Sequence, residues 1–406
     1  MNANTGTRQL GRIDRSVWAL GFVSMFMDIS SEMIHSLLPL YLVGVLGASA
    51  LTVGLIEGIA EATASISKIF SGALSDYLGK RKLLAAIGYA MSAFTKPIFP
   101  LASSLGWVVA ARFLDRVGKG VRGAPRDALV ADVTPEALRG AAYGLRQSLD
   151  TVGAFVGPLL ALVLMYVTAS QFKTVFWAAV LPAFVAVAIM IFAVREPVRA
   201  GGAKAARSPI RLADVRALPS AYWEVVAIGA VLALARFSEA FLILRSQNLG
   251  LRVMFAPLVL VLMNIVYALG AYPAGRWSDR VNKRWLLVAG LALLIVSDLV
   301  LAYAAGLVAA ALGIVLWGAH MAMTQGLFAT LVAQHAPAAL RGTAFGVFNL
   351  LSGIAMLGAS VLAGALWDSY GPGATFIASA VLTAGAVLGL LLLGRQSRQD
   401  KREAST

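Results

Sequence analysis

Long apolar runs are the feature that most limits what this chain can fold into. They recur at lengths of about 20 residues, the length of a helix that crosses the hydrocarbon core of a bilayer. Hydrophobic residues make up 59% of the 406 residues and charged residues only 13%. An average soluble domain has roughly 25% charged residues. We therefore expect an all-α membrane protein that crosses the bilayer many times.

The apolar runs predict twelve spans. The predicted ranges are 17–45, 51–75, 83–103, 106–128, 140–168, 173–194, 221–246, 253–278, 285–305, 307–334, 341–367 and 373–394.

The chain also repeats itself at an offset of half its length. Asp76 lies in a charged turn after the second predicted span, and Asp279 lies in an echo of that turn 203 positions later (279 − 76). A segment similar to the one around Arg139 occurs around Arg341, 202 positions later (341 − 139). Two blocks that keep nearly one offset indicate that the fold consists of two related halves.

The repeat predicts the domain organisation. We expect an N-terminal six-helix bundle over 1–200, a polar linker over 201–218 and a C-terminal six-helix bundle over 219–406. The two bundles are expected to be pseudo-symmetric.

The net charge of +14 is explained by where the basic residues lie. They gather at both ends of the chain and in the loops after spans 2, 6 and 8, whereas the opposite loops are short and almost free of them. Lysine and arginine accumulate on the cytoplasmic side, so both termini are expected inside the cell. Nucleic acid is not needed to explain the charge. Short loops and an Ala- and Gly-rich composition favour a bacterial inner membrane.

The pattern Gly-x-x-x-Asp-x-x-Gly-Lys-Arg, from Gly72 to Arg81, lies between spans 2 and 3 of a six-plus-six arrangement. This combination resembles the major facilitator superfamily of transporters over essentially the whole chain. In span 5, the segment from Gly153 to Gly157-Pro158 is similar to the antiporter signature of that superfamily, although its further glycines are replaced by Leu159-Leu160-Ala161. The family pattern in span 4 is also altered.

The resemblance implies a set of gating residues. Asp76 would lie at the N-terminus of span 11, near Arg341, where the helix dipole favours a carboxylate. Breaking that contact would open the cytoplasmic side. The other gating candidates are Gly72, Arg81, Gly153, Gly157, Pro158 and Asp279. The alternative is that the charged turn only fixes topology.

Charged residues inside the predicted spans are the best site candidates, because a charge at the bilayer centre costs at least about 2.5 kcal/mol on insertion scales. Asp28, Glu32 and His35 lie in span 1 at helical spacing and share one face. They can carry a proton, or they can bind a metal ion through oxygen and nitrogen. The third possibility is that they only pair with arginines of span 4.

Arg112 and Arg116 lie on one face of span 4, together with Lys119. The resemblance implies that spans 1, 4, 7 and 10 line the transport cavity. A span-4 arginine near span-1 carboxylates looks like the proton-antiport arrangement of some exporters in the superfamily. We therefore expect Asp28 or Glu32 to take the proton and Arg112 or Arg116 to sense it. A basic wall could also attract an organic anion.

Further candidates for substrate binding come from spans 7 and 10. Arg236 and Glu239 are three residues apart and can pair with each other. His320 and Gln325 are polar residues of span 10. An amphiphilic drug would need aromatic side chains in the cavity, for which Trp317, Phe241 and Phe328 are candidates.

The sequence thus predicts a proton-coupled secondary transporter that exports a small molecule, a metal ion or a metal chelate by alternating access. The alternatives are import of an organic anion along span 4, and a non-transporting membrane enzyme or receptor. We expect no enzyme and no cofactor, because the sequence has no Walker-type phosphate loop and no His-Glu-x-x-His zinc motif. We expect a monomer whose partners are the substrate, protons and lipid.

Overall fold

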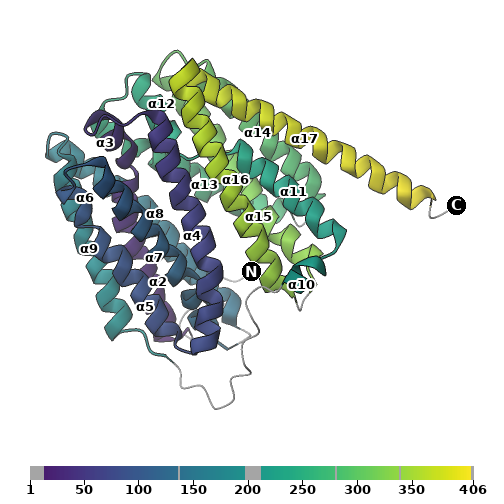
Figure 1. The fold of residues 1–406 in the computed structure, drawn as a ribbon, viewed down its shortest axis with the longest axis horizontal. Coiled ribbons are helices and arrows are strands. Elements are labelled where there is room, and N and C mark those ends of the chain that lie inside the picture. Colours follow the sequence, from purple (N-terminus) through teal and green to yellow (C-terminus); the bar gives the residue numbers. More distant parts are fainter. Residues whose placement is uncertain (1–12, 136–137, 197–211, 279–280, 338–339, 404–406) are drawn as a thin grey trace. The chain divides into compact units, whose positions relative to one another are not determined.

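The structure is a computed structural model that describes residues 13–135, 138–196, 212–278, 281–337 and 340–403. These residues form helices joined by turns, and no strand occurs within the described ranges. Figure 1 colours the helices along the chain from purple to yellow. They are α2 (Arg15–His35), α3 (Leu38–Gly44), α4 (Ala50–Leu78), α5 (Arg81–Thr95), α6 (Ile98–Leu101), α7 (Leu105–Asp132), α8 (Arg139–Val167), α9 (Phe172–Phe192), α10 (Leu212–Arg216), α11 (Ser220–Ala235), α12 (Ala240–Asn248), the short 3-10 helix η2 (Val253–Phe255), α13 (Pro257–Ser278), α14 (Lys283–Ala302), α15 (Leu307–His335), α16 (Arg341–Tyr370) and α17 (Pro372–Glu403).

The expected all-α membrane fold is confirmed. Within the described ranges, ten helical segments are long and apolar enough to cross a membrane. They match every predicted span except the third and the fourth. Span 3 is interrupted at Lys96-Pro97, where α5 ends and α6 begins. Lys96 keeps helical backbone (φ −60°, ψ −44°), but Pro97 has no N–H to continue the helical hydrogen bonds. Span 4 is α7, which carries too many charges to pass as apolar.

The chain divides into two compact units. The N-terminal unit comprises Met1–Gly47, Ile59–Pro209 and Val253–Leu258, and the C-terminal unit comprises Ala48–Gly58, Ile210–Arg252 and Val259–Thr406. Helix α4 is divided between them, because its first residues belong to the C-terminal unit. Most of the predicted linker, 201–218, lies outside the described residues, so its boundaries stay a prediction.

In the N-terminal unit, α2 packs against α8 and α9, and α5 packs against α7 (Figure 1). A buried apolar cluster that includes Leu20, Met27 and Ala186 joins α2 to α9. Tyr89 of α5 belongs to the same cluster, and its hydroxyl lies 3.3 Å from Ser24 Oγ of α2. This packing places the charged faces of α2, α7 and α8 inside one unit.

In the C-terminal unit, α14 packs against α15 and α17, and α11 packs against α16 and α17. Tyr222 of α11 donates a hydrogen bond to the carbonyl of Ala344 at 2.8 Å. Phe237 lies at the centre of an aromatic cluster, with ring centroids 5.4 Å from those of Phe241, Trp317 and Phe376.

Two further spans, 1 and 7, are interrupted near polar residues. Span 1 turns at Ser36-Leu37, and the proline that follows stands in the first turn of α3, where its missing N–H costs nothing. Span 7 breaks between Ala235 and Ala240 without a proline, and Arg236 adopts extended backbone there (φ −102°, ψ 97°). The Ser238 hydroxyl accepts a hydrogen bond from the Ala240 amide at 3.3 Å, at the start of the second half of the span.

Candidate functional site

Two glycines of α8 let that helix approach the carboxyl-bearing face of α2. A Cβ atom added to Gly153 would lie 2.5 Å from the carbonyl oxygen of Met25 and 3.0 Å from Cβ of Asp28. A Cβ atom added to Gly157 would lie 2.8 Å from Cβ of Glu32. Side chains longer than hydrogen would push the helices apart at these points. The predicted gating glycines therefore position the predicted proton-coupling residues within the N-terminal unit.

Asp28 meets a second carboxyl group across this interface. It lies within hydrogen-bonding reach of Asp150 of α8. Asp150 is also 3.8 Å from Arg126 and 3.5 Å from Arg146, which lies one helical turn before it. Arg126 donates a further hydrogen bond to Ser24 Oγ at 2.9 Å. Asp150 thus has two cationic partners, and Asp28 lies on its other side.

Glu32 and His35 contact each other rather than forming one group with Asp28. Oε2 of Glu32 lies 3.3 Å from Nδ1 of His35, and both side chains are partly exposed. Among the residues that the structure describes, no three His, Cys, Asp or Glu side chains are grouped closely enough to hold a metal ion. The proposed metal site at Asp28, Glu32 and His35 therefore gains no support from their arrangement.

The charges of α7 lie mostly in the interior of the N-terminal unit. Arg112 and Arg116 are each 2% exposed, so neither side chain reaches the open surface expected of a cavity wall. Asp115 accepts a hydrogen bond from Lys96 Nζ at 2.9 Å. Arg116 lies 3.5 Å from Glu61 of α4 and 3.9 Å from Asp115. The span-4 charges form a buried network tied to α4 and to the end of α5.

Lys119 is the span-4 cation that stays exposed. It lies within electrostatic reach of both Asp28 and Glu32. Arg122, one turn further, is buried; it hydrogen-bonds to Ser92 and stands over the Tyr89 ring at 5.0 Å. The structure thus brings Asp28 and Glu32 within electrostatic reach of Lys119, and Glu32 also within that of the buried Arg116.

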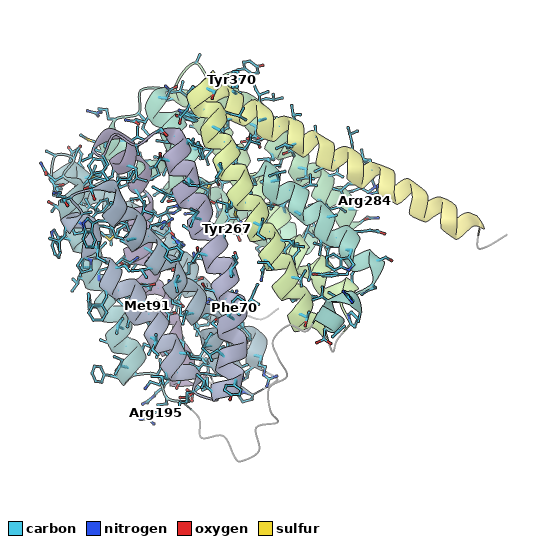
Figure 2. All side chains as sticks on the ribbon, in the orientation of Figure 1. Phe70, Met91, Arg195, Tyr267, Arg284 and Tyr370 are labelled. Atoms are coloured by element: carbon cyan, nitrogen blue, oxygen red, sulfur yellow. The ribbon has the colours of Figure 1, made fainter. Side chains whose placement is uncertain are left out.

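In the C-terminal unit, a cluster of polar side chains lies at the break in span 7. Arg236 lies 3.9 Å from Glu239, as expected from their spacing. With its amide oxygen turned toward Arg236, Gln325 accepts from that guanidinium at 3.2 and 3.3 Å and donates to the Tyr267 hydroxyl at 3.1 Å. Figure 2 labels Tyr267 on α13. Three of the four substrate-binding candidates of this half are therefore brought together.

His320, the fourth candidate, is fully buried, with its Nδ1 2.9 Å from the carbonyl oxygen of Gly290. It holds α15 against α14. Trp317 and Phe241 are fully buried as well, which does not fit the drug-lining role considered for them. The side chain of Phe328 lies outside the described residues.

Comparison with known proteins decides the family. The model of the Major Facilitator Superfamily matches residues 20–357 and again residues 226–406. The chain belongs to the Major Facilitator Superfamily. The expected resemblance is therefore confirmed, and the chain is a secondary transporter in a membrane rather than an enzyme.

Its relatives in the superfamily are similar over most of their length. An uncharacterized MFS-type transporter of Methanocaldococcus jannaschii is 31% identical over 389 residues, covering 94% of this chain and 95% of the relative. The multidrug resistance protein MdtH of Yersinia pestis is 26% identical over 309 residues, covering 71% and 70%. The crystal structure of the human organic anion transporter MFSD10 (TETRAN) is 17% identical, with a TM-score of 0.68 over 93% of this chain and 99% of that chain. The last likeness shows the fold alone.

The gating contact implied by the superfamily resemblance falls largely outside what is described. Asp279 and the side chains of Asp76 and Arg341 lie outside the described residues. Arg81 is described; it forms an ion pair with Asp132 at 2.7 Å and donates to the Ala128 carbonyl at 3.1 Å. A Cβ atom on Gly72 would lie 3.3 Å from that of Ala124. Arg81 and Gly72 thus attach the charged turn to α7.

Sequence reasoning missed two residues of this superfamily member. Lys96 is a lone charge in an otherwise apolar run. Because burying a charge in a membrane span is costly, that position could have marked Lys96 as a candidate with a buried partner. Asp150 has the i, i+4 spacing of an ion pair with Arg146, and its proximity to Asp28 depends on the glycine-mediated contact of α8 with α2. That contact follows from helix packing, which the spacing within one helix does not reveal.

Proposed function

We propose that the chain is a proton-coupled exporter of a small organic molecule. It would exchange protons for substrate by alternating access in a bacterial inner membrane, as a monomer with both termini in the cytoplasm. Support comes from the carboxyl pair of the N-terminal unit and from the similarity to multidrug resistance proteins named MdtH.

The observation that carries the proposal is the contact of Asp28 with Asp150. Two ionised carboxylates repel each other at this range, so such a pair favours sharing one proton. Arg126 and Arg146 compensate the charge of Asp150. Asp28 is therefore the member of the pair that we assign to carry the proton.

Release of that proton would create a negative charge beside Lys119 and Arg122. Both cations belong to α7, so the charge state of α2 would act directly on that helix. Arg116, which contacts Asp115 and Glu61, would transmit the change to α4. The sensor role of Arg112 stays a prediction from its place in span 4. In this proposal Glu32 and His35 bind substrate, because they are partly exposed and lie one to two turns from Asp28.

The burial of Arg112 and Arg116 weighs against the alternative of organic anion import along span 4, because only Lys119 of that stripe is exposed. Within the C-terminal unit, Arg236, Glu239 and Gln325 are the residues that we propose for substrate contacts. They carry both signs of charge beside amide and hydroxyl groups, which suits a polar or cationic organic molecule better than a simple anion.

A direct test uses everted membrane vesicles that contain the protein. Vesicles are energised to acidify the lumen, and uptake of ethidium and a panel of other fluorescent organic cations is followed. We expect accumulation of at least one probe, abolished when the pH gradient is collapsed with the membrane potential maintained. Accumulation that persists without the pH gradient would contradict proton coupling.

A carboxyl outside the candidate site provides the matched control. Asp214→Asn removes a charge of the same type from the short helix α10 and should leave accumulation unchanged. Asp28→Asn should abolish accumulation at equal protein content in the membrane.

A further inference from the structure

Ser379 of α17 makes two hydrogen-bond contacts that its single proton cannot serve alone. Its Oγ lies 2.7 Å from the carbonyl oxygen of Ala235 and 2.5 Å from Oδ2 of Asp298. A hydroxyl group donates one hydrogen, and a carbonyl oxygen can only accept. The Ser379 hydrogen therefore goes to Ala235. The hydrogen in the contact with Asp298 then has to come from the carboxyl group.

The opposite assignment is unfavourable. If Ser379 donated to an ionised Asp298, its oxygen and the Ala235 carbonyl oxygen would face each other at 2.7 Å with no hydrogen between them. A buried carbonyl would then also lose its donor. The chain Asp298 O–H to Ser379 Oγ–H to Ala235 O=C satisfies all three groups, and it requires a neutral carboxyl.

The surroundings of Asp298 favour the same state. Asp298 is 0% exposed, and within the described part of the chain its Oδ1 has no hydrogen-bond partner. Charged and titratable groups on the neighbouring elements are engaged elsewhere. His320 of α15 bonds to Gly290, and Arg236 at the break faces Glu239.

Arg245 of α12 binds the C-terminal end of α14, the helix that carries Asp298. Its guanidinium donates to the carbonyls of Leu301, Ala302 and Ala304 at 2.9 to 3.1 Å. Its contacts thus go to the end of α14. Glu224 lies near the start of α11, and α17 carries no charged residue between Pro372 and Leu391.

The position of the group links it to the break in span 7. Ala235 is the last residue of α11, and its carbonyl is one of the terminal carbonyls that an α-helix leaves without an internal partner. Asp298 and Ser379 thus hold the end of the first half of span 7, and Arg245 attaches the second half to the end of α14. Both halves of the broken span are thus linked to α14, the first half through Ser379 of α17.

We propose that Asp298 is a proton-binding site of the C-terminal unit that controls the break in span 7. With its proton, Asp298 donates to Ser379, and Ser379 holds the Ala235 carbonyl. When the proton leaves to water that enters the break, the carboxylate becomes an acceptor and competes with Ala235 for the Ser379 hydrogen. The end of α11 is then released. The site does not depend on the role assigned to Asp28.

Infrared spectroscopy of the purified transporter tests the protonation state. A protonated carboxylic acid has a carbonyl stretching band separate from the carboxylate bands. The wild-type spectrum minus that of Asp298→Asn at neutral pH should show this band. Ser379→Ala should shift the band, because the acid loses its acceptor. Wild-type and Asp298→Asn spectra that are identical in this region would overturn the proposal.

Hydrogen–deuterium exchange tests control of the break. Asn at position 298 can still donate to Ser379 but cannot ionise. After correction for intrinsic rates, amides of 236–245 in the wild type should lose protection by about tenfold or more as pH rises. The same amides in Asp298→Asn should keep their protection over that range. Equal pH profiles for the two proteins, or a wild-type profile that is flat, would contradict the switch.

A matched variant separates the switch from general loosening. Asp368→Asn replaces another aspartate of the C-terminal unit, one whose carboxylate accepts two backbone hydrogen bonds. It should leave both the infrared band and the pH profile of 236–245 as in the wild type. Loss of the band in this variant would contradict its assignment to Asp298.

Discussion

Lys96 Nζ donates a hydrogen bond to Oδ1 of Asp115 over 2.9 Å in the interior of the N-terminal unit. The two side chains are 1% and 3% exposed, and Lys96 also donates to Ser31 Oγ of α2 at 3.0 Å. The negative charge of Asp115 is therefore compensated within the bundle. The neighbour of Asp28 is the carboxyl group of Asp150. Asp28 therefore remains our proposed proton carrier.

Removing Lys96 should destabilise the protein strongly. Lys96→Met leaves Asp115 without its hydrogen-bonded cation in a buried site, which typically costs about 3–5 kcal/mol in the free energy of unfolding. Asp115→Leu introduced into the same variant should recover much of that loss, since the carboxylate that lost its hydrogen-bonded cation is then absent. Denaturation of the purified protein in detergent measures both changes.

A more exposed ion pair gives the comparison. Arg81 and Asp132 also make a short contact, at 2.7 Å, but their side chains are 14% and 25% exposed. Arg81→Gln should cost only about 0–1 kcal/mol, as for other solvent-accessible pairs. Equal losses in Lys96→Met and Arg81→Gln would show that the buried pair has no special weight.

Enlarging Gly157 should displace the candidate site. In Gly157→Ala the new methyl group meets Ile29 O and Glu32 Cβ at 2.8 Å, so α2 and α8 have to separate. Overpacking of this kind costs about 1–3 kcal/mol in unfolding free energy. Transport should fall together with stability, because Asp28 moves away from Asp150. Dye accumulation and thermal unfolding are measured on the same preparation.

The same helix contains its own control. Gly144 of α8 has open space around the position of a Cβ atom, and alanine is the better helix former by about 1 kcal/mol. Gly144→Ala should leave stability unchanged or raise it slightly. If Gly144→Ala and Gly157→Ala behave alike, the close approach of α8 to α2 does not position the site.

Most of the fold could be predicted from the sequence, because apolar runs of bilayer length leave few alternatives to membrane helices. Span 4 was located even though its charges exclude it on hydropathy. The break in span 7 could not be predicted, since no proline marks it. It depends on hydroxyl groups of other helices, including Ser379, which binds the Ala235 carbonyl at 2.7 Å.

The candidate site was only partly predictable for a related reason. Helical spacing placed Asp28, Glu32 and His35 on one face, and the contact of Glu32 with His35 follows from it. Spacing within one helix cannot show which residue of another helix lies opposite. The sequence predicted span-4 arginines near the span-1 carboxylates, and Arg122 of that span lies within electrostatic reach of Asp28. It did not predict the hydrogen-bonding neighbour of Asp28, which is Asp150 of α8.

Asp368 should hold the start of α4 within the C-terminal unit. Its carboxylate accepts hydrogen bonds from the amides of Ala50 and Leu51 at 3.1 and 2.9 Å, so a residue of α16 caps another helix. Asp368→Ala leaves both amides unpaired, and a lost cap costs about 0.5–2 kcal/mol. Hydrogen–deuterium exchange of amides 50–54 should become faster in this variant.

A graded series makes that test specific. Asp368→Asn keeps one oxygen acceptor but loses the negative charge that the helix N-terminus favours. Its exchange rate should fall between those of the wild type and Asp368→Ala. Unchanged exchange in Asp368→Ala would show that the two hydrogen bonds do not restrain α4.

The measurement that tests proton coupling most directly is proton movement driven by substrate. Liposomes containing the purified protein and a pH-sensitive dye are loaded with a transported probe and diluted into probe-free buffer. With the wild type, outward flow of the probe should draw protons inward and acidify the lumen. With Asp28→Asn, the probe should leave without acidification. Equal acidification in the two proteins, or none in the wild type, would contradict the account.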